Sequence, residues 1–367
     1  MAAFDYDVII AGSGPAGVST WLHLNKLNPE LAARTLVLEK ASHPRPKLCG
    51  GGVMRFADTL LGLLRVRIKV TSVPVHNAEF RYHGRRFYWR QKNFFRVVRR
   101  HEFDSALAAA ALQRGMRLHE QEALSHFEYL EDGIQVYTAR RCYRTRVLVG
   151  ADGANSAVRA SMKLREPHRV ARLIEILTPA DPVSSYEFAT NTAVFDFTAV
   201  DKGLQGYIWD FPCLENGAAY INRGIYDSRY YPTREHADLK KLFRAGLEAR
   251  QVYGEAKKWQ GHPERWFDPY ATVSQPHILL VGDAAGVDPL AGEGISFALG
   301  YGAVAAEELV EAFDKQNFRF AHYREHILAH PLGKALQQRR LMARLCYRGW
   351  PRVLTTMFFI VMGLRWP

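Results

Sequence analysis

The sequence predicts an α/β protein with a Rossmann-like lobe, an inserted lobe built on an antiparallel sheet, and a helical segment at the C-terminus. Residues 6–11 form a short apolar run followed by a glycine, and residues 15–27 carry apolar side chains at helical spacing. Two further apolar runs, 147–150 and 278–282, end in glycine and have the composition of buried strands in a parallel sheet. Between them, residues 170–225 contain alternating stretches that are typical of an antiparallel sheet.

The sequence also predicts the strands, loops and helices between these segments. A strand at 34–39 is the parallel partner of the first strand, so the N-terminal segment forms one βαβ unit. Proline and glycine are frequent at 43–52, which predicts an ordered loop. The remaining predictions are a helix at 54–64, a hairpin at 77–89, a helix at 101–114 and a long apolar helix at 292–313.

The chain is long enough for two lobes. Its 367 residues exceed one average domain, and a hydrophobic content of 48% is ample for a buried core. We assign residues 1–75, 97–165 and 268–330 to a discontinuous cofactor-binding lobe, 76–96 and 166–267 to a substrate lobe, and 331–367 to the C-terminal helical segment.

The charge and the cysteines restrict the class of partner and the compartment. Lysine and arginine total 49 against 37 acidic residues, and the net charge of +12 suits either the anionic face of a membrane or an ordinary solvated surface. No zinc-finger or RNA-recognition signature supports a nucleic-acid partner. The four cysteines form no CxxC pair, and Asp5 and Asp7 interrupt the first apolar stretch. We therefore expect a cytoplasmic protein without a secretory signal, a disulfide framework or a structural zinc site.

A GxGxxG motif follows the first predicted strand directly and opens the first predicted helix. Gly12 permits the tight turn, Gly14 lets the backbone approach a pyrophosphate, and Gly17 allows close packing of helix on strand. The helix N-terminus offers free N–H groups to the anion, and Glu39 at the end of the next strand is expected to accept hydrogen bonds from ribose hydroxyls. The dinucleotide-binding residues predicted here are Gly12, Gly14, Pro15, Ala16, Gly17, Glu39 and Lys40.

Two further motifs distinguish between NAD and FAD. Residues 150–156 (GADGANS) resemble the DG motif of the glutathione-reductase-like flavoproteins, and 282–286 (GDAAG) resemble their GD motif. The resemblance implies FAD, with Asp283 hydrogen-bonded to the ribityl chain, backbone N–H groups of 289–295 facing the pyrimidine edge of the flavin, and Asp152 tuning the fold around the cofactor. A helix N-terminus beside a ring that becomes anionic on reduction favours reduced flavin. The cofactor residues that this resemblance adds are Asp152, Gly282, Asp283, Pro289, Gly292, Glu293, Gly294 and Ile295.

Two segments narrow the resemblance to the geranylgeranyl reductase family. Residues 46–52 (PKLCGGG) are similar to its KxCGGG loop, and 207–212 (YIWDFP) match its YxWxFP motif. The resemblance implies an enzyme that saturates isolated double bonds of an isoprenoid chain, on a geranylgeranyl-type lipid or a prenyl quinone, with hydride from the flavin N5 and a proton. The electron donor, NADPH or ferredoxin, stays open, and a nicotinamide donor would bind transiently because no second GxGxxG follows.

The same segments supply the candidate catalytic and substrate residues. Alternate residues of a strand share a face, so the rings of Tyr207 and Trp209 are expected to point together toward the flavin and to stabilise a carbocation-like state, with Phe211 beside the substrate. The alternative is that these rings are simply part of the core. Cys49, followed by Gly50, is implied to lie near the isoalloxazine, where the thiol either donates the proton or is a small residue at a crowded position.

Arg100 belongs to a third local resemblance. It precedes Phe103 and Asp104 in the Arg-x-x-Phe-Asp element of these flavoproteins. The resemblance implies a contact with the edge of the cofactor or a neighbouring loop. A salt bridge is the alternative role.

Other classes of flavoprotein share the cofactor motifs. Flavin-dependent aromatic hydroxylases usually carry His after GDAA and a later Gly-Gln-Gly, whereas this chain has Gly286 and Glu293. A halogenase, whose WxWxIP resembles residues 207–212, and a non-enzymatic flavin electron carrier also remain alternatives. No HExxH or paired-histidine spacing and no Ser-His-Asp elbow is present, so the sequence predicts neither a metal site nor a hydrolase.

The C-terminal segment contains an apolar run at 353–364 that follows several arginines and is bordered by Trp350 and Trp366. The run is too short to span a bilayer, which requires about 20 apolar residues. It predicts an interfacial helix in peripheral contact with a membrane, or a helix that packs on the substrate lobe or a dimer interface. The sequence leaves the oligomeric state undetermined.

Overall fold

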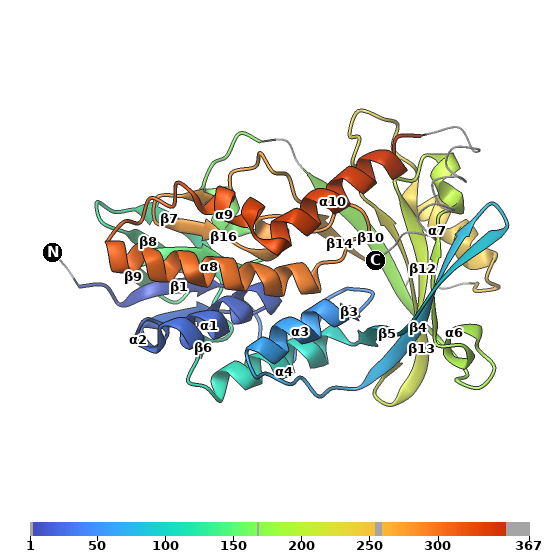
Figure 1. Cartoon of the computed structure of the whole chain (residues 1–367), viewed down its shortest axis with the longest axis horizontal. Helices are drawn as coiled ribbons and strands as arrows, with labels where there is room; N and C mark the ends of the chain where they lie inside the picture. Colours follow the sequence, from blue (N-terminus) through green and yellow to red (C-terminus); the bar gives the residue numbers. More distant parts are fainter. Residues whose placement is uncertain (1–2, 167–168, 254–258, 350–367) are drawn as a thin grey trace.

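The computed structural model describes residues 3–166, 169–253 and 259–349. Two sheets occupy opposite ends of the long axis of the molecule, sheet A toward the N-terminus and sheet B at the other end (Figure 1). Sheet A has the order β15-β16-β9-β1-β2-β6, and the β7–β8 hairpin joins it through β9. Its strands are β1 (Tyr6–Ala11), β2 (Thr35–Leu38), β6 (Arg117–His119), β7 (Leu124–Tyr129), β8 (Ile134–Thr138), β9 (Cys142–Gly150), β15 (Ser274–Gln275) and β16 (Ile278–Leu280).

The centre of sheet A is parallel, as the sequence predicts. β1 pairs in parallel with β2 on one side and with β9 on the other, and β9 pairs in parallel with β16. The GxGxxG loop, Glu39, the DG motif and the GD motif each follow the carboxyl end of one of these strands. Because parallel strands end at the same edge of a sheet, segments that are far apart in the chain meet there.

Sheet B is mostly antiparallel. Its order is β14-β10-β13-β12-β11-β4-β5-β3, with one parallel pair, β11 with β4, among otherwise antiparallel neighbours. The predicted hairpin is longer than 77–89 at both ends, since β4 and β5 pair from Ser72 to Val98. The strands are β3 (Gly52–Met54), β4 (Ser72–Tyr82), β5 (Arg85–Val98), β10 (Val170–Pro179), β11 (Thr192–Asp196), β12 (Gly206–Glu215), β13 (Ala218–Asp227) and β14 (Gln260–Arg265).

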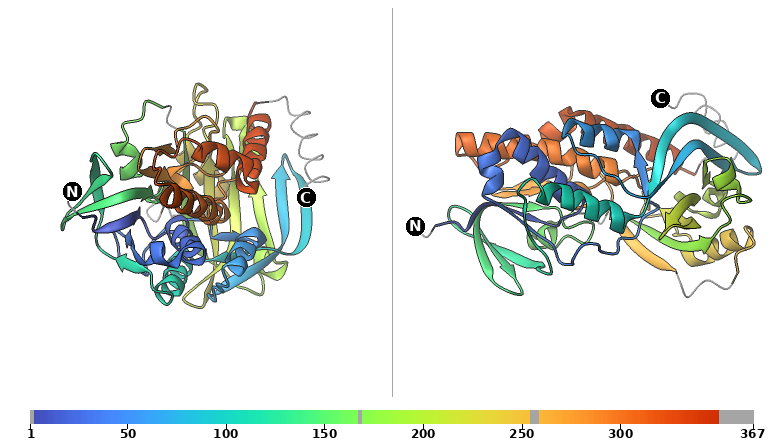
Figure 2. Two further views of the ribbon diagram at one scale, coloured as in Figure 1. Left: turned by 60° about the vertical axis from the view of Figure 1, so that its left-hand side comes forward. Right: turned by 90° about the horizontal axis from the view of Figure 1, so that it is seen from below.

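Helices cover the sheets and connect the two lobes. α1 packs on α8 beside sheet A, with α3 and α4 nearby, and α10 runs from the sheet A end toward sheet B (Figures 1 and 2). The helices are α1 (Pro15–Leu27), α2 (Pro29–Ala33), α3 (Arg55–Leu63), α4 (Arg100–Leu112), α5 (Ala157–Ser161), α6 (Tyr186–Ala189), α7 (Leu239–Glu248), α8 (Ile295–Lys315), α9 (Tyr323–Ala329) and α10 (Pro331–Cys346), with 3-10 turns η1 (Thr198–Lys202) and η3 (Gly282–Ala284).

The long apolar helix begins later than the sequence predicts. The expected start was residue 292, but α8 begins at Ile295 because Gly292 adopts a φ of +65° in the preceding turn. The predicted apolar run at 353–364 lies outside the described residues, and the lobe boundaries stay a prediction.

Candidate functional site

A cavity of about 760 Å³ lies between the carboxyl edge of sheet A and the inner face of sheet B. Its volume is in the range of sites for cofactors and drug-sized ligands. Loops from sheet A line one end, and side chains of sheet B line the other. The predicted site residues that line it are Gly12, Gly14, Pro15, Ala16, Glu39, Lys40, Cys49, Gly50, Arg100, Asp152, Tyr207, Trp209, Phe211, Asp283, Gly292, Glu293, Gly294 and Ile295.

Three predicted cofactor residues do not line the cavity. A Cβ on Gly17 would lie 1.9 Å from the carbonyl oxygen of Gly12, so this glycine allows helix α1 to pack on the turn. Gly282 lies in η3 with a φ of +59°, against the side chain of Ala16. The carbonyl oxygen of Pro289 accepts a hydrogen bond from Ser228 Oγ at 2.7 Å. These residues shape the walls of the site.

The GxGxxG turn forms an open cradle at the N-terminus of α1. Gly12 has a φ of +108°, and a Cβ on Gly14 would meet no atom closer than Arg45 Nη2 at 3.4 Å. No side chain caps α1, and its first turn contains no acidic residue. Its first N–H groups therefore point at the cavity with the positive end of the helix dipole, as an anion site requires.

Glu39 directly follows strand β2, and its carboxylate has several hydrogen-bond and ion-pair partners. Oε2 accepts hydrogen bonds from Ser13 N at 3.1 Å and from Ser13 Oγ at 2.8 Å, and Oε1 accepts one from Ala41 N at 3.1 Å. Arg45 Nε lies 3.2 Å from Oε2. Burial alone would raise the pKa of Glu39, but Arg45 and the bonds from Ser13 lower it below its ordinary value. Glu39 is therefore a fixed charged acceptor.

Arg100 is engaged in the salt bridge that the sequence left as an alternative. Its Nε and Nη2 donate to the two carboxylate oxygens of Asp104 at 2.8 and 2.9 Å, and both residues are buried. Arg45 lies 3.4 Å from the same carboxylate, so Asp104 joins the two arginines. Arg100 also borders the cavity beside Cys49.

The DG motif and the start of α8 also line the cavity. Asp152 Oδ2 accepts a hydrogen bond from Val158 N at 3.1 Å, while Oδ1 is buried with no partner among the described residues. Asp283 and the turn at 292–294 line the cavity, and the N-cap residue of α8 is Gly294, which has no side chain to cap the helix. Glu293 Oε1 instead accepts a hydrogen bond from Ser296 N at 3.0 Å.

Cys49 is fixed by its backbone to two strands of sheet B. Its N–H donates to Glu175 Oε1 at 3.2 Å, and its carbonyl oxygen accepts a hydrogen bond from Asn222 Nδ2 at 3.2 Å. Asn222 Oδ1 in turn accepts the indole N–H of Trp209 at 2.8 Å. The Cys49 loop and the aromatic strand therefore hold each other in place. Burial raises the pKa of the thiol above its ordinary value, and Arg100 offsets this only in part.

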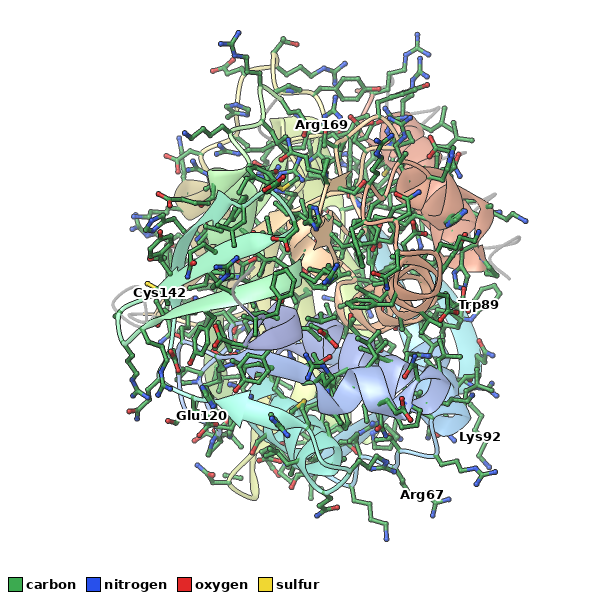
Figure 3. The ribbon with its side chains drawn as sticks, turned by 90° about the vertical axis from the view of Figure 1, so that its left-hand side faces the viewer. Arg67, Trp89, Lys92, Glu120, Cys142 and Arg169 are labelled. Carbon is green, nitrogen blue, oxygen red and sulfur yellow. The ribbon has the colours of Figure 1, made fainter. Side chains whose placement is uncertain are left out.

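The other cysteines lie away from this loop. Cys142 is exposed at the surface near sheet A (Figure 3), and Cys213 and Cys346 are buried.

Strand β12 gives the cavity an aromatic wall. Tyr207, Trp209 and Phe211 alternate along it and all line the cavity, as the Tyr-x-Trp spacing predicts. The ring centroids of Tyr207 and Trp209 lie 6.2 Å apart, and Tyr207 donates its hydroxyl to Ala291 O at 2.5 Å. Further rings from neighbouring strands line the same cavity: Phe80, Trp89, Phe94, Phe95, Phe195, Phe197 and Tyr226.

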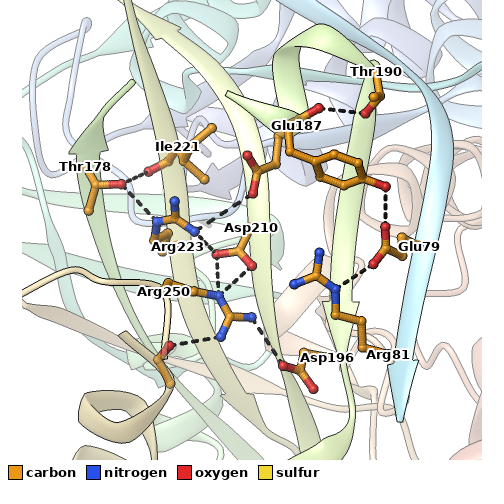
Figure 4. A network of polar contacts seen from close by, with 12 residues as sticks. Glu79, Arg81, Thr178, Glu187, Thr190, Asp196, Asp210, Ile221, Arg223 and Arg250 are labelled. Carbon is orange, nitrogen blue, oxygen red and sulfur yellow. Dashed lines mark hydrogen bonds and ion pairs between the residues drawn. The ribbon is translucent and has the colours of Figure 1, made fainter. Parts of the chain in front are cut away.

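The outer face of β12 is anchored by buried charges (Figure 4). Asp210 is fully buried and accepts a hydrogen bond from Arg250 Nε at 2.7 Å, and Arg223 pairs with the same carboxylate. Arg250 also lies 3.4 Å from Asp196 on β11. This network fixes the strand whose other face carries the aromatic wall.

Several polar residues of the cavity wall were not predicted from the sequence, among them Lys47, Glu175, His262 and Glu264. Lys47 stands inside the PKLCGGG segment, but the others belong to no motif. His262 and Glu264 alternate on β14, and this spacing was the one available signal. Lys47 Nζ contacts His262 Nε2, and burial together with Lys47 lowers the pKa of His262 to about 3.

The residues present fit FAD. An open glycine cradle, a fixed carboxylate and an uncapped helix N-terminus lie at one end, and the glycine-containing turn that opens α8 borders the same cavity together with Asp283. The buried Oδ1 of Asp152 is an acceptor that lacks a partner within the described chain. These groups provide what a pyrophosphate, ribose hydroxyls and an anionic ring edge require.

Comparisons with known proteins agree with this description. The FAD binding domain family matches residues 5–316 of the chain. A digeranylgeranylglycerophospholipid reductase of Methanococcus vannielii is 24% identical over 326 residues, which cover 85% of this chain and 79% of that protein.

Solved structures share the fold. A geranylgeranyl bacteriochlorophyll reductase-like protein from Thermoplasma acidophilum superposes with a TM-score of 0.74 at 20% identity, over 94% of this chain and 87% of that one. The halogenase PltM, in a structure that contains FAD, gives a TM-score of 0.73 at 16% identity, over 96% of this chain and 78% of that one. The chain thus belongs to the FAD binding domain family, as an FAD-dependent oxidoreductase with geranylgeranyl reductase-like relatives.

Proposed function

We propose that this protein saturates isolated double bonds in the isoprenoid chain of a lipid or a prenyl quinone. One observation carries the proposal: the cofactor end of the cavity opens directly onto an aromatic wall inside one continuous space. A digeranylgeranylglycerophospholipid reductase among the relatives supports a prenyl lipid as the substrate class.

The two ends of the cavity suit the two reactants. FAD, when bound and reduced, supplies a hydride from N5. Phe211 and the rings of the neighbouring strands bury apolar surface of a branched hydrocarbon chain and exclude water from it. The faces of Tyr207 and Trp209 stabilise positive charge that develops on the alkene as it is protonated. Indole and hydroxyl hydrogen bonds fix the orientation of both rings.

Cys49 is the third residue that we propose to act at the reacting bond. It lies at the junction between the cofactor loops and the aromatic wall. Its thiol either donates the proton or serves as a small group that leaves room for the flavin and the alkene.

We further propose that the substrate is delivered from a membrane surface. Among the described residues, no helix is long and apolar enough to cross a bilayer. The arginines and the apolar run of the C-terminal segment 331–367 support a peripheral contact with that surface. NADPH or ferredoxin would reduce the flavin from outside, because the chain contains a single dinucleotide motif.

Anaerobic single turnover tests the proposed reaction. The holoprotein is photoreduced, mixed with a digeranylgeranyl phospholipid or a menaquinone, and followed by flavin absorbance and by mass spectrometry of the lipid. We expect reoxidation of the flavin and a gain of two hydrogens for each bond reduced. The flavin of a hydroxylase or halogenase would instead require oxygen for its reoxidation. The flavin of an electron carrier would be reoxidised by the quinone without any change in the mass of the prenyl chain.

A further inference from the structure

The cavity is lined by a buried carboxyl group, that of Glu264, which belongs to none of the sequence motifs. Glu264 lies on β14, the edge strand of sheet B, and lines the cavity together with Gln260 and His262. The residue is only 7% exposed. Its Oε1 is buried and has no hydrogen-bond partner among the described residues. A polar atom left in this state indicates an interaction with a group that occupies the cavity.

Glu264 lies directly against the turn that borders the aromatic wall. A Cβ on Gly292 would lie 3.3 Å from Glu264 Oε2 and 2.8 Å from a ring carbon of Tyr226. The preceding residue, Ala291, accepts the hydroxyl of Tyr207. The carboxyl group thus lies beside the same turn as the tyrosine that we propose to stabilise the cationic alkene.

The surroundings favour the protonated form of this carboxyl group. Burial, followed by the nearby carboxylates of Asp283 and Asp288, raises its pKa well above the ordinary value, and Glu293 adds to the effect. Lys47 opposes the shift, and Tyr207, Tyr226 and His262 are titratable groups that line the cavity with Glu264. Among the described residues, no cluster of His, Cys, Asp and Glu is arranged to hold a metal ion, so we do not assign these carboxylates to a cation.

The Cys49 thiol is a weaker candidate for the same task. Protonation of an isolated alkene requires a proton donor, and the ordinary pKa of a carboxyl group lies several units below that of a thiol; because burial raises the pKa of both groups, the ordinary order of acidity favours Glu264. The thiol starts from an ordinary pKa of 9.0, and burial raises it further.

We propose that Glu264 donates the proton in the alkene reduction. The inference rests on the proposed function. The O–H bond of Glu264 breaks as the π electrons of the alkene form a C–H bond, and hydride from the reduced flavin forms the second C–H bond. The alkene gains two electrons and the flavin loses two. Glu264 is left as a carboxylate beside Lys47 and regains its proton from water.

The variant Glu264→Gln tests whether Glu264 is the proton donor, because the amide side chain has nearly the same shape as the carboxyl group and cannot protonate an alkene. The variant should bind FAD and be photoreduced like the wild type. Its anaerobic reoxidation by a digeranylgeranyl phospholipid should be slower by at least about 100-fold, the usual contribution of a general acid. Glu308→Gln, which changes a buried glutamate on α8 that does not line the cavity, should keep the wild-type rate.

Two further measurements do not depend on turnover. The infrared difference spectrum between the resting wild-type holoprotein and Glu264→Gln should contain one carbonyl band of a protonated carboxyl group, because other buried carboxyl groups with a raised pKa, such as Asp288 and Glu293, contribute equally to both spectra and cancel. The free energy of unfolding of the apoprotein should also respond to pH. Above about pH 4.5 the unfolded glutamate ionises while the folded one keeps its proton, so the wild type loses stability relative to Glu264→Gln as the pH rises.

The outcomes separate this inference from the proposed function. Reoxidation of the wild type and of Glu264→Gln at equal rates would overturn the assignment of Glu264 and leave the reductase standing. A wild type that no prenyl lipid reoxidises would overturn both. If Glu264→Gln fails to fold, Glu264→Met takes its place, because this side chain has a similar length and no acidic proton, and an unchanged rate in that variant would contradict the assignment.

Discussion

The backbone of Cys49 is held independently of its thiol. Its N–H donates to Glu175 and its carbonyl group accepts from Asn222, whereas the Sγ atom accepts the N–H of Gly51 at 3.3 Å and interacts with the Arg100 guanidinium. These backbone contacts are independent of the side chain, so replacement of the thiol should leave the loop in place.

Cys49→Ala should bind FAD with unchanged affinity and keep its alkene-reduction rate within about 10-fold of the wild type, because Glu264 rather than the thiol supplies the proton. Fluorescence titration of FAD and anaerobic single turnover measure the two quantities. A loss of most turnover with intact FAD binding would instead assign the proton to Cys49.

At the scale of the element, two glycines of the same motif have different tasks. A Cβ on Gly17 would meet the backbone oxygen of Gly12 at 1.9 Å, whereas a Cβ on Gly14 meets only the end of the Arg45 side chain, at 3.4 Å. The first glycine is required by the fold of the βαβ unit, and the second by the ligand.

Gly17→Ala should therefore lower the melting temperature of the apoprotein or prevent folding, since the overpacked turn costs about 1–3 kcal/mol or more. Gly14→Ala should leave that melting temperature unchanged and weaken FAD binding by at least about 10-fold, because its methyl group occupies the path of the pyrophosphate. Thermal unfolding and FAD titration of both variants provide the check. Normal FAD affinity in Gly14→Ala would contradict the assignment of the cradle.

Strand β12 carries charge on one face and aromatic rings on the other. Asp210 neutralises Arg223 and Arg250 on the outer face (Figure 4), and the same strand presents Tyr207 and Trp209 to the cavity. The ion network thus supports the position of the aromatic wall.

Asp210→Ala should lower the free energy of unfolding by about 3–5 kcal/mol, because two arginines lose their buried partner. Asp58→Ala is the matched control, since Asp58 is 47% exposed in its pair with Arg96 and should change the free energy by about 0–1 kcal/mol. Urea unfolding of both variants measures the difference. Similar values for the two would show that the buried network contributes little.

At the scale of the whole molecule, the site exists only where the two sheets meet. Sheet A contributes the ends of its parallel strands, sheet B contributes the inner face of β12 and its neighbours, and the 45–52 loop crosses between them. Neither sheet alone encloses both a cofactor and a hydrocarbon chain.

Deletion of residues 350–367 should abolish flotation with anionic liposomes and leave FAD binding intact, because the basic and apolar tail lies beyond the described cavity-forming elements. Flotation assays with anionic and with neutral vesicles, in low and in high salt, measure this. Undiminished flotation of the shortened protein would refute membrane anchoring by the tail.

The sequence by itself determined the FAD lobe and the convergence of its motifs. Gly12, Glu39 and Asp283 follow short apolar strands, and parallel strands bring their carboxyl ends to one edge whatever the length of chain between them. It also determined the shared face of Tyr207 and Trp209, because strand alternation is a local property.

Only the tertiary structure decided which other side chains enter the site. Arg100 forms a salt bridge with Asp104, and α8 starts three residues later than expected. Glu264, on the edge strand of sheet B, lines the cavity. The physical reason is that burial and charge depend on neighbours from distant segments. A glutamate in a short strand has no local signal that it will lie unpaired among other carboxylates.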